Sequence, residues 1–344
     1  MSEAPQPIRD APAPFSGVVD TDTDDPAPDF IIRSNDGVDL HVHRGILHYA
    51  SVFFRDLLGA WDAGTMTPDD LRDGKPIAKL PESCTILHRL LCIAYPQTSL
   101  DYLLTEQTLD GLYEVHEAAQ KYFFGHARGA IEKMLADPAL LDAHPHRIFA
   151  IARLRDLPEL ARKAALSTLK TYVCPDGLLF PETEALSASA FQKLHEFHHS
   201  CGKAAEQLAI RNAKSVDHQY PDPEITHYEH PGSSYGYEFV WWTQGKSHSE
   251  ECRPRVEYFA EGDWAELTPS PWFQHHMAVV ASKLRRIPIR ETVNENVRVL
   301  ADMDQAMIKG CGKCIEHAER ELVDFGEQLG ERIKESNNRL AESL

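Results

Sequence analysis

The chain has 344 residues and a formal charge of −18, with 35 basic against 53 acidic side chains. This balance argues against a general nucleic-acid-binding protein, because phosphate contacts need a basic surface. No apolar run approaches the roughly 18 residues of a membrane span, and the start MSEAPQPIRDAPAPFSG lacks a signal-peptide core. Seven scattered cysteines do not suggest a disulfide framework. We therefore expect an intracellular protein, cytoplasmic or nuclear, with no membrane partner.

The first elements are predicted from Asp29 onward. Residues 1–28 are rich in Pro, Ala and Asp, and we expect them to form a disordered acidic tail. Residues 30–33 are aromatic or β-branched, as in a buried strand, and Asn35-Asp36-Gly37 suits a tight hairpin turn. Residues 38–42 alternate between apolar and polar, which predicts a half-buried second strand.

Helices follow the hairpin. Ile46, Leu47 and Ala50 form the apolar face of a short helix, and Ser51 is placed to cap a second helix that Gly59 ends. Residues 77–96, IAKLPESCTILHRLLCIAYP, predict a strand and then a helix. Residues 109–135, LDGLYEVHEAAQKYFFGHARGAIEKML, predict two more helices.

Residues 29–137 resemble a BTB/POZ domain, an α/β protein-interaction module, and the matching pieces occur in the family's order. The acidic loop before Ile77 and the segment after Leu135 are most similar to the fungal branch of that family. The residues that carry the resemblance are Asp29, the Asn-Asp-Gly turn, His43-Arg44, Ile46-Leu47, Ser51, Phe53-Phe54, Tyr95, Ala118-Ala119 and Lys121-Tyr122.

The resemblance implies a non-enzymatic protein that binds protein partners. Family members act as adaptors, as oligomerising parts of transcription regulators, or as substrate receptors for cullin-based ubiquitin ligases. It also implies a charged binding pocket near a dimer interface, here at Asp29, His43 and Arg44. The hydrophobic-x-Glu signature that helps some members bind cullin is not evident between Leu58 and Ile77, so a cullin partner stays open.

Self-association is left open as well. Family dimers often exchange a helix and a strand that precede the Asp-led strand, but Pro and Asp argue against that helix here, and only Val18 and Val19 suggest a strand. We expect a monomer, or a weaker homo-oligomer through the BTB/POZ-like domain or a C-terminal helix. In that helix the residues Ile308, Ile315, Leu322 and Leu329 repeat every seven positions, with Ala318 and Phe325 at the other seam position.

The rest of the chain is expected to be mostly helical. Residues 138–213 predict a helical extension broken at Pro158, and residues 214–344 predict a loop-rich segment followed by C-terminal helices. The last helix is predicted from Val293 to about Leu340. The expected architecture is an α/β BTB/POZ-like domain, with short strands flanked by helices, followed by a mostly α-helical C-terminal region.

Two short motifs invite a catalytic interpretation. HEFHH, residues 195–199, fits the H-E-x-x-H pattern of zinc hydrolases, with Glu196 as base, but Ala205 stands where a third histidine ligand belongs. GSSYG, residues 232–236, fits a nucleophile elbow at Ser234 but has no strand before it or helix after it. A zinc-dependent hydrolase is therefore the alternative to the adaptor, and we expect no enzyme.

Cysteines outside the BTB/POZ-like domain are candidates for a structural zinc site, and no other cofactor is expected. Cys311 and Cys314 have zinc-knuckle spacing, and Cys201 and Cys252 would complete four thiolates if three segments converge. The helix would then have to begin, or be distorted, near Cys311. On the sequence alone the preferred interpretation is that these cysteines pack in helix cores as small hydrophobes. The substitute ligands are His198, His199 and His248.

Overall fold

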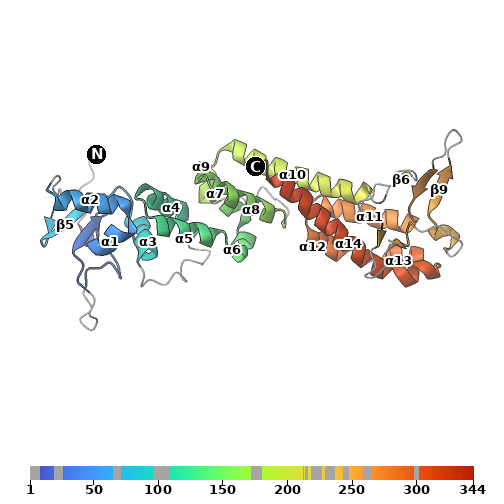
Figure 1. Cartoon of the computed structure of the whole chain (residues 1–344), viewed down its shortest axis with the longest axis horizontal. Helices are drawn as coiled ribbons and strands as arrows, with labels where there is room; N and C mark the ends of the chain where they lie inside the picture. The colour runs from blue at the N-terminus through green and yellow to red at the C-terminus, as the bar shows by residue number, and fades with distance from the viewer. Residues whose placement is uncertain are drawn as a thin grey trace. The chain divides into compact units, whose positions relative to one another are not determined.

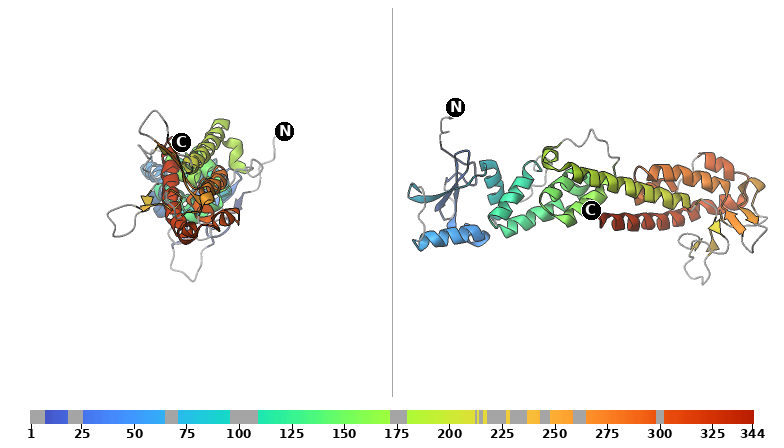
Figure 2. Two further views of the ribbon diagram at one scale, coloured as in Figure 1. Left: turned by 90° about the vertical axis from the view of Figure 1, so that its right-hand side faces the viewer. Right: turned by 90° about the horizontal axis from the view of Figure 1, so that it is seen from above.

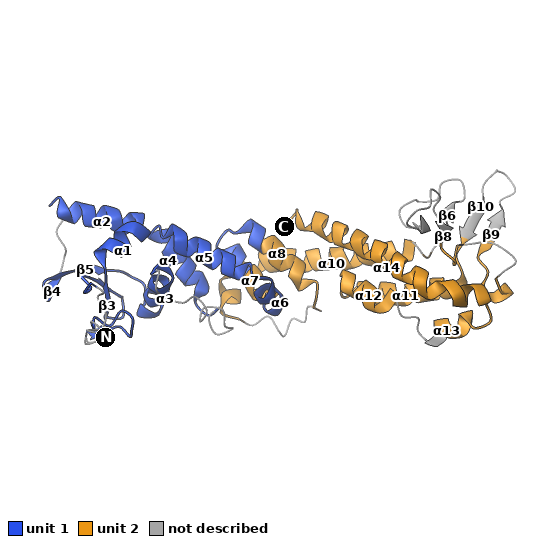
Figure 3. Ribbon diagram, turned by 60° about the horizontal axis from the view of Figure 1, so that its bottom comes forward, with its two compact units in different colours: residues 1–144, 150–160 blue, residues 145–149, 161–344 orange. Residues whose placement is uncertain are grey.

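The chain folds into two compact units. The computed structural model describes residues 8–18, 26–64, 71–95, 109–171, 180–211, 213, 216–217, 227–228, 237–242, 248–258, 265–297 and 302–344. One unit contains residues 1–144 and 150–160, and the other contains residues 145–149 and 161–344 (Figure 3). The predicted division into an α/β part and a mostly helical part is confirmed. No described helix is both long enough and apolar enough to span a membrane.

The N-terminal unit is built on one small mixed sheet (Figure 1). Its strand order is β1-β3-β2-β5-β4, in which β2 and β3 form an antiparallel hairpin and β5 runs parallel to β2. Gly37 turns the hairpin with a φ of 73°, as predicted. The elements are β1 (Arg9–Asp10), β2 (Phe30–Arg33), β3 (Val38–Val42), α1 (Arg44–Ala50), α2 (Val52–Asp62), β4 (Leu71–Arg72), β5 (Lys75–Lys79), α3 (Cys84–Ala94), α4 (Leu112–Lys121), α5 (Gly125–Leu135) and α6 (Pro138–Ala143).

Part of the predicted disordered tail is ordered. β1 pairs parallel to β3, and the ring of Phe15, which is 1% exposed, meets the ring of Tyr95 edge-on. The Phe15 carbonyl accepts a hydrogen bond from the backbone of His41. This covering segment explains why all of β3 is buried, where the alternating pattern predicted a half-buried strand. The composition of residues 1–28 could not indicate that one aromatic residue, Phe15, would pack against Tyr95 and order this segment.

A buried carboxylate joins the strands of this sheet. Asp39 is fully buried, and its oxygens accept hydrogen bonds of 2.6 Å from both Arg33 and Arg72. Burial alone would raise the pKa of Asp39, but these two guanidinium groups outweigh it and lower the pKa. Arg72 also pairs with Asp10, which contacts His41 at 2.9 Å. The network therefore connects β1, β2, β3 and β4.

Ser51 joins two distant parts of the N-terminal unit. As predicted, its hydroxyl caps α2 by accepting a hydrogen bond of 3.1 Å from the backbone of Phe54. The same hydroxyl donates to the carbonyl of Tyr122 at 2.6 Å. The phenol of Tyr122 in turn donates to Glu82, the residue that lies between β5 and α3.

The C-terminal unit is a helical bundle with short strands. Helices α10 and α14 lie side by side in it, with α11 packed on α10 and α12 packed on α14 (Figures 1 and 2). Helices α7 (Pro145–Leu154) and α8 (Pro158–Thr168) contribute residues to both units. The remaining elements are α9 (Pro181–Ala185), α10 (Ala188–Arg211), β6 (Val216–Asp217), β7 (His227–Tyr228), β8 (Tyr237–Glu238), the 3₁₀ helix η5 (Glu250–Cys252), β9 (Arg255–Tyr258), β10 (Ala265–Thr268), α11 (Pro271–Leu284), α12 (Arg290–Val297), α13 (Asp302–Ile308) and α14 (Gly312–Ala341).

The long final helix predicted from Val293 is wrong in its extent, because the chain forms α12, α13 and α14 instead. The predicted seven-residue seam is also only partly buried. Ile315 is 55% exposed, whereas Leu322 and Leu329 are fully buried in the unit's own core. The buried residues of α14 follow the ordinary helical period rather than a strict heptad. They are Cys314, Ala318, Glu321, Leu322, Phe325, Gly326, Leu329, Gly330, Ile333, Asn337 and Ala341.

An aromatic cluster fills the core of this unit. Trp241 stacks between Phe239 and Phe273, with ring centroids 4.7 and 4.4 Å away. Phe325 of α14 meets the Trp241 ring edge-on. The backbone N–H of Val240 donates to the buried carboxylate of Glu321, which fastens this segment to α14.

Replacement of Ser51 by alanine should destabilise the N-terminal unit. The variant loses a helix cap, worth about 1 kcal/mol, and leaves the Tyr122 carbonyl without its partner, which costs about 1–3 kcal/mol. Urea unfolding should therefore show a midpoint shift in the transition of this unit. The matched control is Ser200→Ala on the exposed face of α10, for which we expect no measurable change. Equal stability of the two variants would contradict the assigned role of Ser51.

Replacement of Glu321 by glutamine should stabilise the protein at neutral pH. Burial raises the pKa of Glu321, so the folded state favours the protonated form. The resulting stability is present below the unfolded pKa and is lost as the pH rises through the folded value. Glutamine keeps the acceptor for Val240 without the buried charge. We expect the difference in melting temperature between variant and wild type to grow from pH 4 to pH 7, and a constant difference would refute this explanation.

Candidate metal centre

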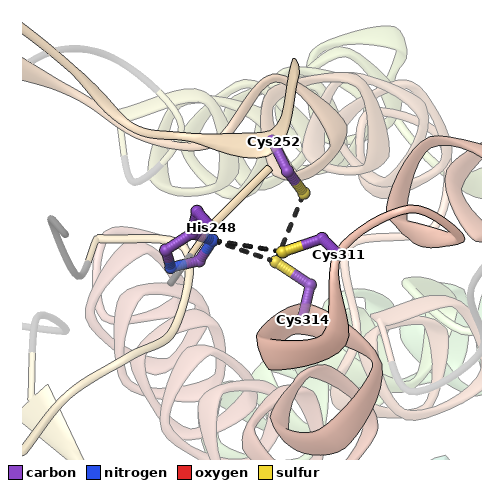
Figure 4. A group of neighbouring side chains, drawn as sticks. All are labelled: His248, Cys252, Cys311 and Cys314. Atoms are coloured by element: carbon purple, nitrogen blue, oxygen red, sulfur yellow. Dashed lines mark hydrogen bonds between the residues drawn. The ribbon is translucent and has the colours of Figure 1, made fainter. Parts of the chain in front are cut away.

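Four potential metal ligands from two segments of the C-terminal unit converge on one point (Figure 4). They are His248, Cys252, Cys311 and Cys314, all buried, with their ligand atoms within 4.8 Å of one another. The Cys252 and Cys314 sulfurs lie 3.3 Å apart. The Nδ1 atom of His248 lies 3.5 Å from the Cys311 sulfur and 3.4 Å from the Cys314 sulfur.

The turn that carries Cys311 and Cys314 is formed where two helices meet. The backbone N–H of Cys311 donates to the carbonyl of Ile308 at the end of α13, and Cys311 itself is the extended N-cap residue of α14. Cys311 is extended, with φ of −119°, and Cys314 in the first turn of α14 faces the same point. The predicted condition that a helix begins beside Cys311 is therefore confirmed.

The turn before α14 is held by the contacts of a buried carboxylate. Asp304 of α13 is fully buried, and its carboxylate contacts Nδ1 of His275 at 2.8 Å and Nδ1 of His276 at 3.1 Å. The second nitrogen of His276 faces the carbonyl of Val297 at 3.0 Å. Both ring nitrogens of His276 therefore lie within hydrogen-bonding distance of an oxygen atom. These contacts fasten α13 to α11 and to the end of α12.

The segment with His248 and Cys252 is fixed to the bundle by serine contacts. Cys252 ends η5, and its backbone N–H donates to the carbonyl of Ser249. Its own carbonyl accepts a hydrogen bond of 2.8 Å from the Ser270 hydroxyl, while the Ser270 backbone donates to Trp241. The ligands therefore adjoin the aromatic core, which excludes water from them.

The arrangement matches the dimensions of a tetrahedral zinc site. Zinc–sulfur bonds of about 2.3 Å and zinc–nitrogen bonds of about 2.0 Å put neighbouring ligand atoms roughly 3.5–3.8 Å apart. The three separations of 3.3 to 3.5 Å need only a slight expansion to accept the ion, and all four ligand atoms lie within 4.8 Å of one another. Three thiolates and one imidazole are a common ligand set of structural zinc. This cluster could therefore bind a metal such as zinc.

The ionisation of the cluster also favours a metal. Burial, followed by the nearby charges of Lys313 and Arg253, lowers the pKa of His248, which keeps the imidazole neutral as a ligand requires. The thiol of Cys314 lowers the pKa of Cys252 to about 7 and has its own pKa raised in return, because the two share one proton. The Nε2 atom of His248 is buried and has no hydrogen-bond partner among the described residues.

Cys201 does not belong to the cluster, so the predicted set of four cysteines needs a correction. Cys201 is fully buried in α10, where burial raises its pKa to about 12, as expected for a small apolar core residue. The fourth member is His248, which the sequence had offered only as a substitute ligand. The signal that singles it out is its spacing to Cys252, H-x₃-C, beside the C-x₂-C of the other pair.

The HEFHH segment forms no metal site among the described residues. His195 and His199 do share one face of α10, as the spacing predicted, but that face is exposed, and neither belongs to a group of three ligands. His198 points the other way, is buried, and contacts the carbonyl of Thr171. Ser234 of the second motif lies outside the described residues.

The residues of the expected charged pocket lie at the start of α1. Asp29 accepts a hydrogen bond of 2.8 Å from the backbone N–H of Arg44, while the Arg44 guanidinium pairs with Asp62. The backbone N–H of His43 donates to the Tyr95 hydroxyl at 2.9 Å. Asp29 and the Arg44 side chain thus serve different partners, and a binding pocket at these residues stays a prediction.

No protein-family model matches the chain, and no curated protein is significantly similar to it.

The purified protein should contain one zinc ion per chain, and the loss of one ligand should remove it. We expect Cys314→Ser and His248→Ala to lose the metal and about 4 kcal/mol or more of stability in the C-terminal unit. The measurement is elemental analysis together with thermal unfolding before and after chelation. Cys201→Ser is the matched control, since it alters a buried thiol outside the cluster and should keep the metal. Metal-free wild-type protein that is insensitive to added zinc would contradict the site.

Proposed function

We propose that this protein is a non-enzymatic adaptor that binds protein partners through its BTB/POZ-like N-terminal unit, and that its C-terminal unit folds around a structural zinc ion. The observation that carries the first half is the arrangement of that unit. The hairpin β2–β3 leads into two short helices, β5 returns parallel to β2, and α3, α4 and α5 follow. This order is the one that the resemblance implies.

The contacts of the motif residues support the same proposal. Asp29 caps the helix that begins at Arg44, His43 contacts Tyr95, and Ser51 contacts Tyr122. The contacts of His43 and Ser51 join the first matching piece of the resemblance to the two later pieces, which end in or contain Tyr95 and Tyr122.

Exposed apolar side chains support a binding role for the N-terminal unit. Tyr49 is 95% exposed and Phe123 is 62% exposed, and Val52 is also at the surface. Phe123 has a φ of 53°, a left-handed conformation that strains a residue with a side chain. Val52 and Phe123 directly follow Ser51 and Tyr122, which are hydrogen-bonded to each other. Aromatic residues held at a surface are typical of interface anchors.

A structural role for the zinc follows from its ligands. Four protein ligands would complete the tetrahedron of a bound ion and would leave no position for a water molecule or a substrate. The cluster is also buried within the core rather than at a cleft. The ion would therefore tie the η5 segment to the start of α14 and contribute to folding. Roles in transcription regulation or in ubiquitin-ligase recruitment are those that the family resemblance offers for such an adaptor.

Capture of partners by the full-length protein tests the adaptor proposal. We expect Tyr49→Ser and Phe123→Asn to lose at least one protein that the wild type retains, because each removes an exposed aromatic anchor. Asparagine tolerates the left-handed φ of position 123, so the backbone is kept. Ile315→Ser is the matched control, since it removes an exposed apolar side chain from the C-terminal unit.

The readout is quantitative mass spectrometry of the captured proteins, with light scattering to record self-association of each variant. Identical partners for the wild type and all three variants would contradict binding through these residues. A loss caused only by Ile315→Ser would move the binding role to the C-terminal unit.

A further inference from the structure

Two sulfur atoms of the ligand cluster lie close enough to react with each other. The Cys252 and Cys314 sulfurs are 3.3 Å apart, closer than the roughly 3.8 Å between two thiolates bound to one zinc ion. A disulfide bond of about 2.05 Å requires a further approach of about 1.3 Å. Both side chains already point toward the same place (Figure 4), so the remaining approach is of the size that side-chain rotation provides.

This pair joins the same two segments that the proposed zinc ion joins. Cys252 ends η5, and Cys314 lies in the first turn of α14. The two residues are 62 positions apart, and a cross-link that closes so long a loop restricts the unfolded chain strongly. A bond between Cys311 and Cys314 would close only a short loop at the start of α14 and would leave η5 untied.

Burial decides which oxidants reach these sulfurs. Cys252 is 2% exposed, and Cys311 and Cys314 are fully buried. Exchange with a disulfide requires that its sulfur approach the attacking thiolate, so a bulky oxidant such as oxidised glutathione is excluded from the cluster. Hydrogen peroxide has only two heavy atoms and is the oxidant that fits such a site. Cys252, the most exposed of the three thiols, is the one that it meets first.

We propose that, with zinc bound as proposed above, the cluster is a redox switch in which hydrogen peroxide replaces the zinc cross-link by a disulfide between Cys252 and Cys314. The thiolate is both the metal ligand and the nucleophile, so the residues that bind the ion are also the ones that react. Oxidation then releases the metal without separating η5 from α14.

The reaction balances with the peroxide as the oxidant. The Cys252 thiolate attacks one peroxide oxygen and the O–O bond breaks, which gives a sulfenic acid and hydroxide. The Cys314 thiolate attacks the sulfenic sulfur, so that the S–S bond forms and the second oxygen leaves as hydroxide. Two protons from solvent convert both hydroxides to water. The two sulfurs together lose two electrons, and Cys311 and His248 are too few ligands to keep a structural ion.

Oxidation and chelation should therefore have different consequences. A chelator removes the metal and leaves η5 without a cross-link to α14, whereas peroxide removes the metal and leaves a covalent one. The oxidised protein should unfold at a higher temperature than the reduced, chelated protein, because the disulfide restricts its unfolded chain.

Treatment of the full-length, zinc-loaded protein with hydrogen peroxide tests the switch. We expect one zinc ion and one Cys252–Cys314 disulfide per chain, measured with a colorimetric chelator and by mass spectrometry of an unreduced digest. Release should be at least about tenfold faster with peroxide than with the same concentration of oxidised glutathione, since access limits the larger reagent. A reductant together with added zinc should restore the metal.

Two serine variants give a matched comparison. Cys311→Ser and Cys314→Ser each remove one ligand from the start of α14, but only Cys311→Ser keeps both reacting sulfurs. Peroxide should form the disulfide in Cys311→Ser and not in Cys314→Ser. Cys201→Ser alters a buried thiol outside the cluster and should behave as the wild type. The digest of the wild type decides the pairing even if a variant does not fold.

Several results would overturn the switch. They are release of zinc without the Cys252–Cys314 bond, a Cys311–Cys314 bond as the main product, equally fast release by oxidised glutathione, and an oxidised protein no more stable than the chelated one. Protein that is purified without zinc and does not bind it would contradict the metal centre itself. Zinc-loaded protein that peroxide leaves unchanged would overturn the switch alone and leave the structural zinc site standing.

Discussion

The convergence of three thiols and one imidazole beside the start of α14 is the constraint on which the C-terminal unit depends. The chain between α10 and α11 forms only strands of two to four residues and one 3₁₀ turn among its described parts. Residues 239–242 of this stretch pack in the aromatic core, but strands this short give little stability of their own to the rest of it. His248 and Cys252 lie in this stretch, and Cys311 and Cys314 lie at the N-terminus of α14, the longest described helix. A single ion bound to all four would join this loop-rich stretch to the first turn of α14.

The same unit shows how its buried charges are satisfied. Asp304 is paired with two histidines, Glu182 with Arg147, and Glu321 receives a backbone N–H. A buried carboxylate without such partners would cost several kcal/mol, so these contacts fix the relative positions of the helices rather than add net stability. The pairing of Asp304 matters most for the metal centre. It fixes α13, and α13 ends three residues before Cys311.

The elements of the N-terminal unit could be predicted because local signals agree there. The Asn-Asp-Gly turn, the apolar periodicity and the Ser51 cap all indicate the same structure, and each is found. The ordered N-terminal segment could not be predicted, since Phe15 depends on a distant partner, Tyr95. The metal ligands lie between these cases. The spacing of Cys311 and Cys314 is local, but the choice of His248 over Cys201 depends on the packing of segments more than fifty residues apart in the chain.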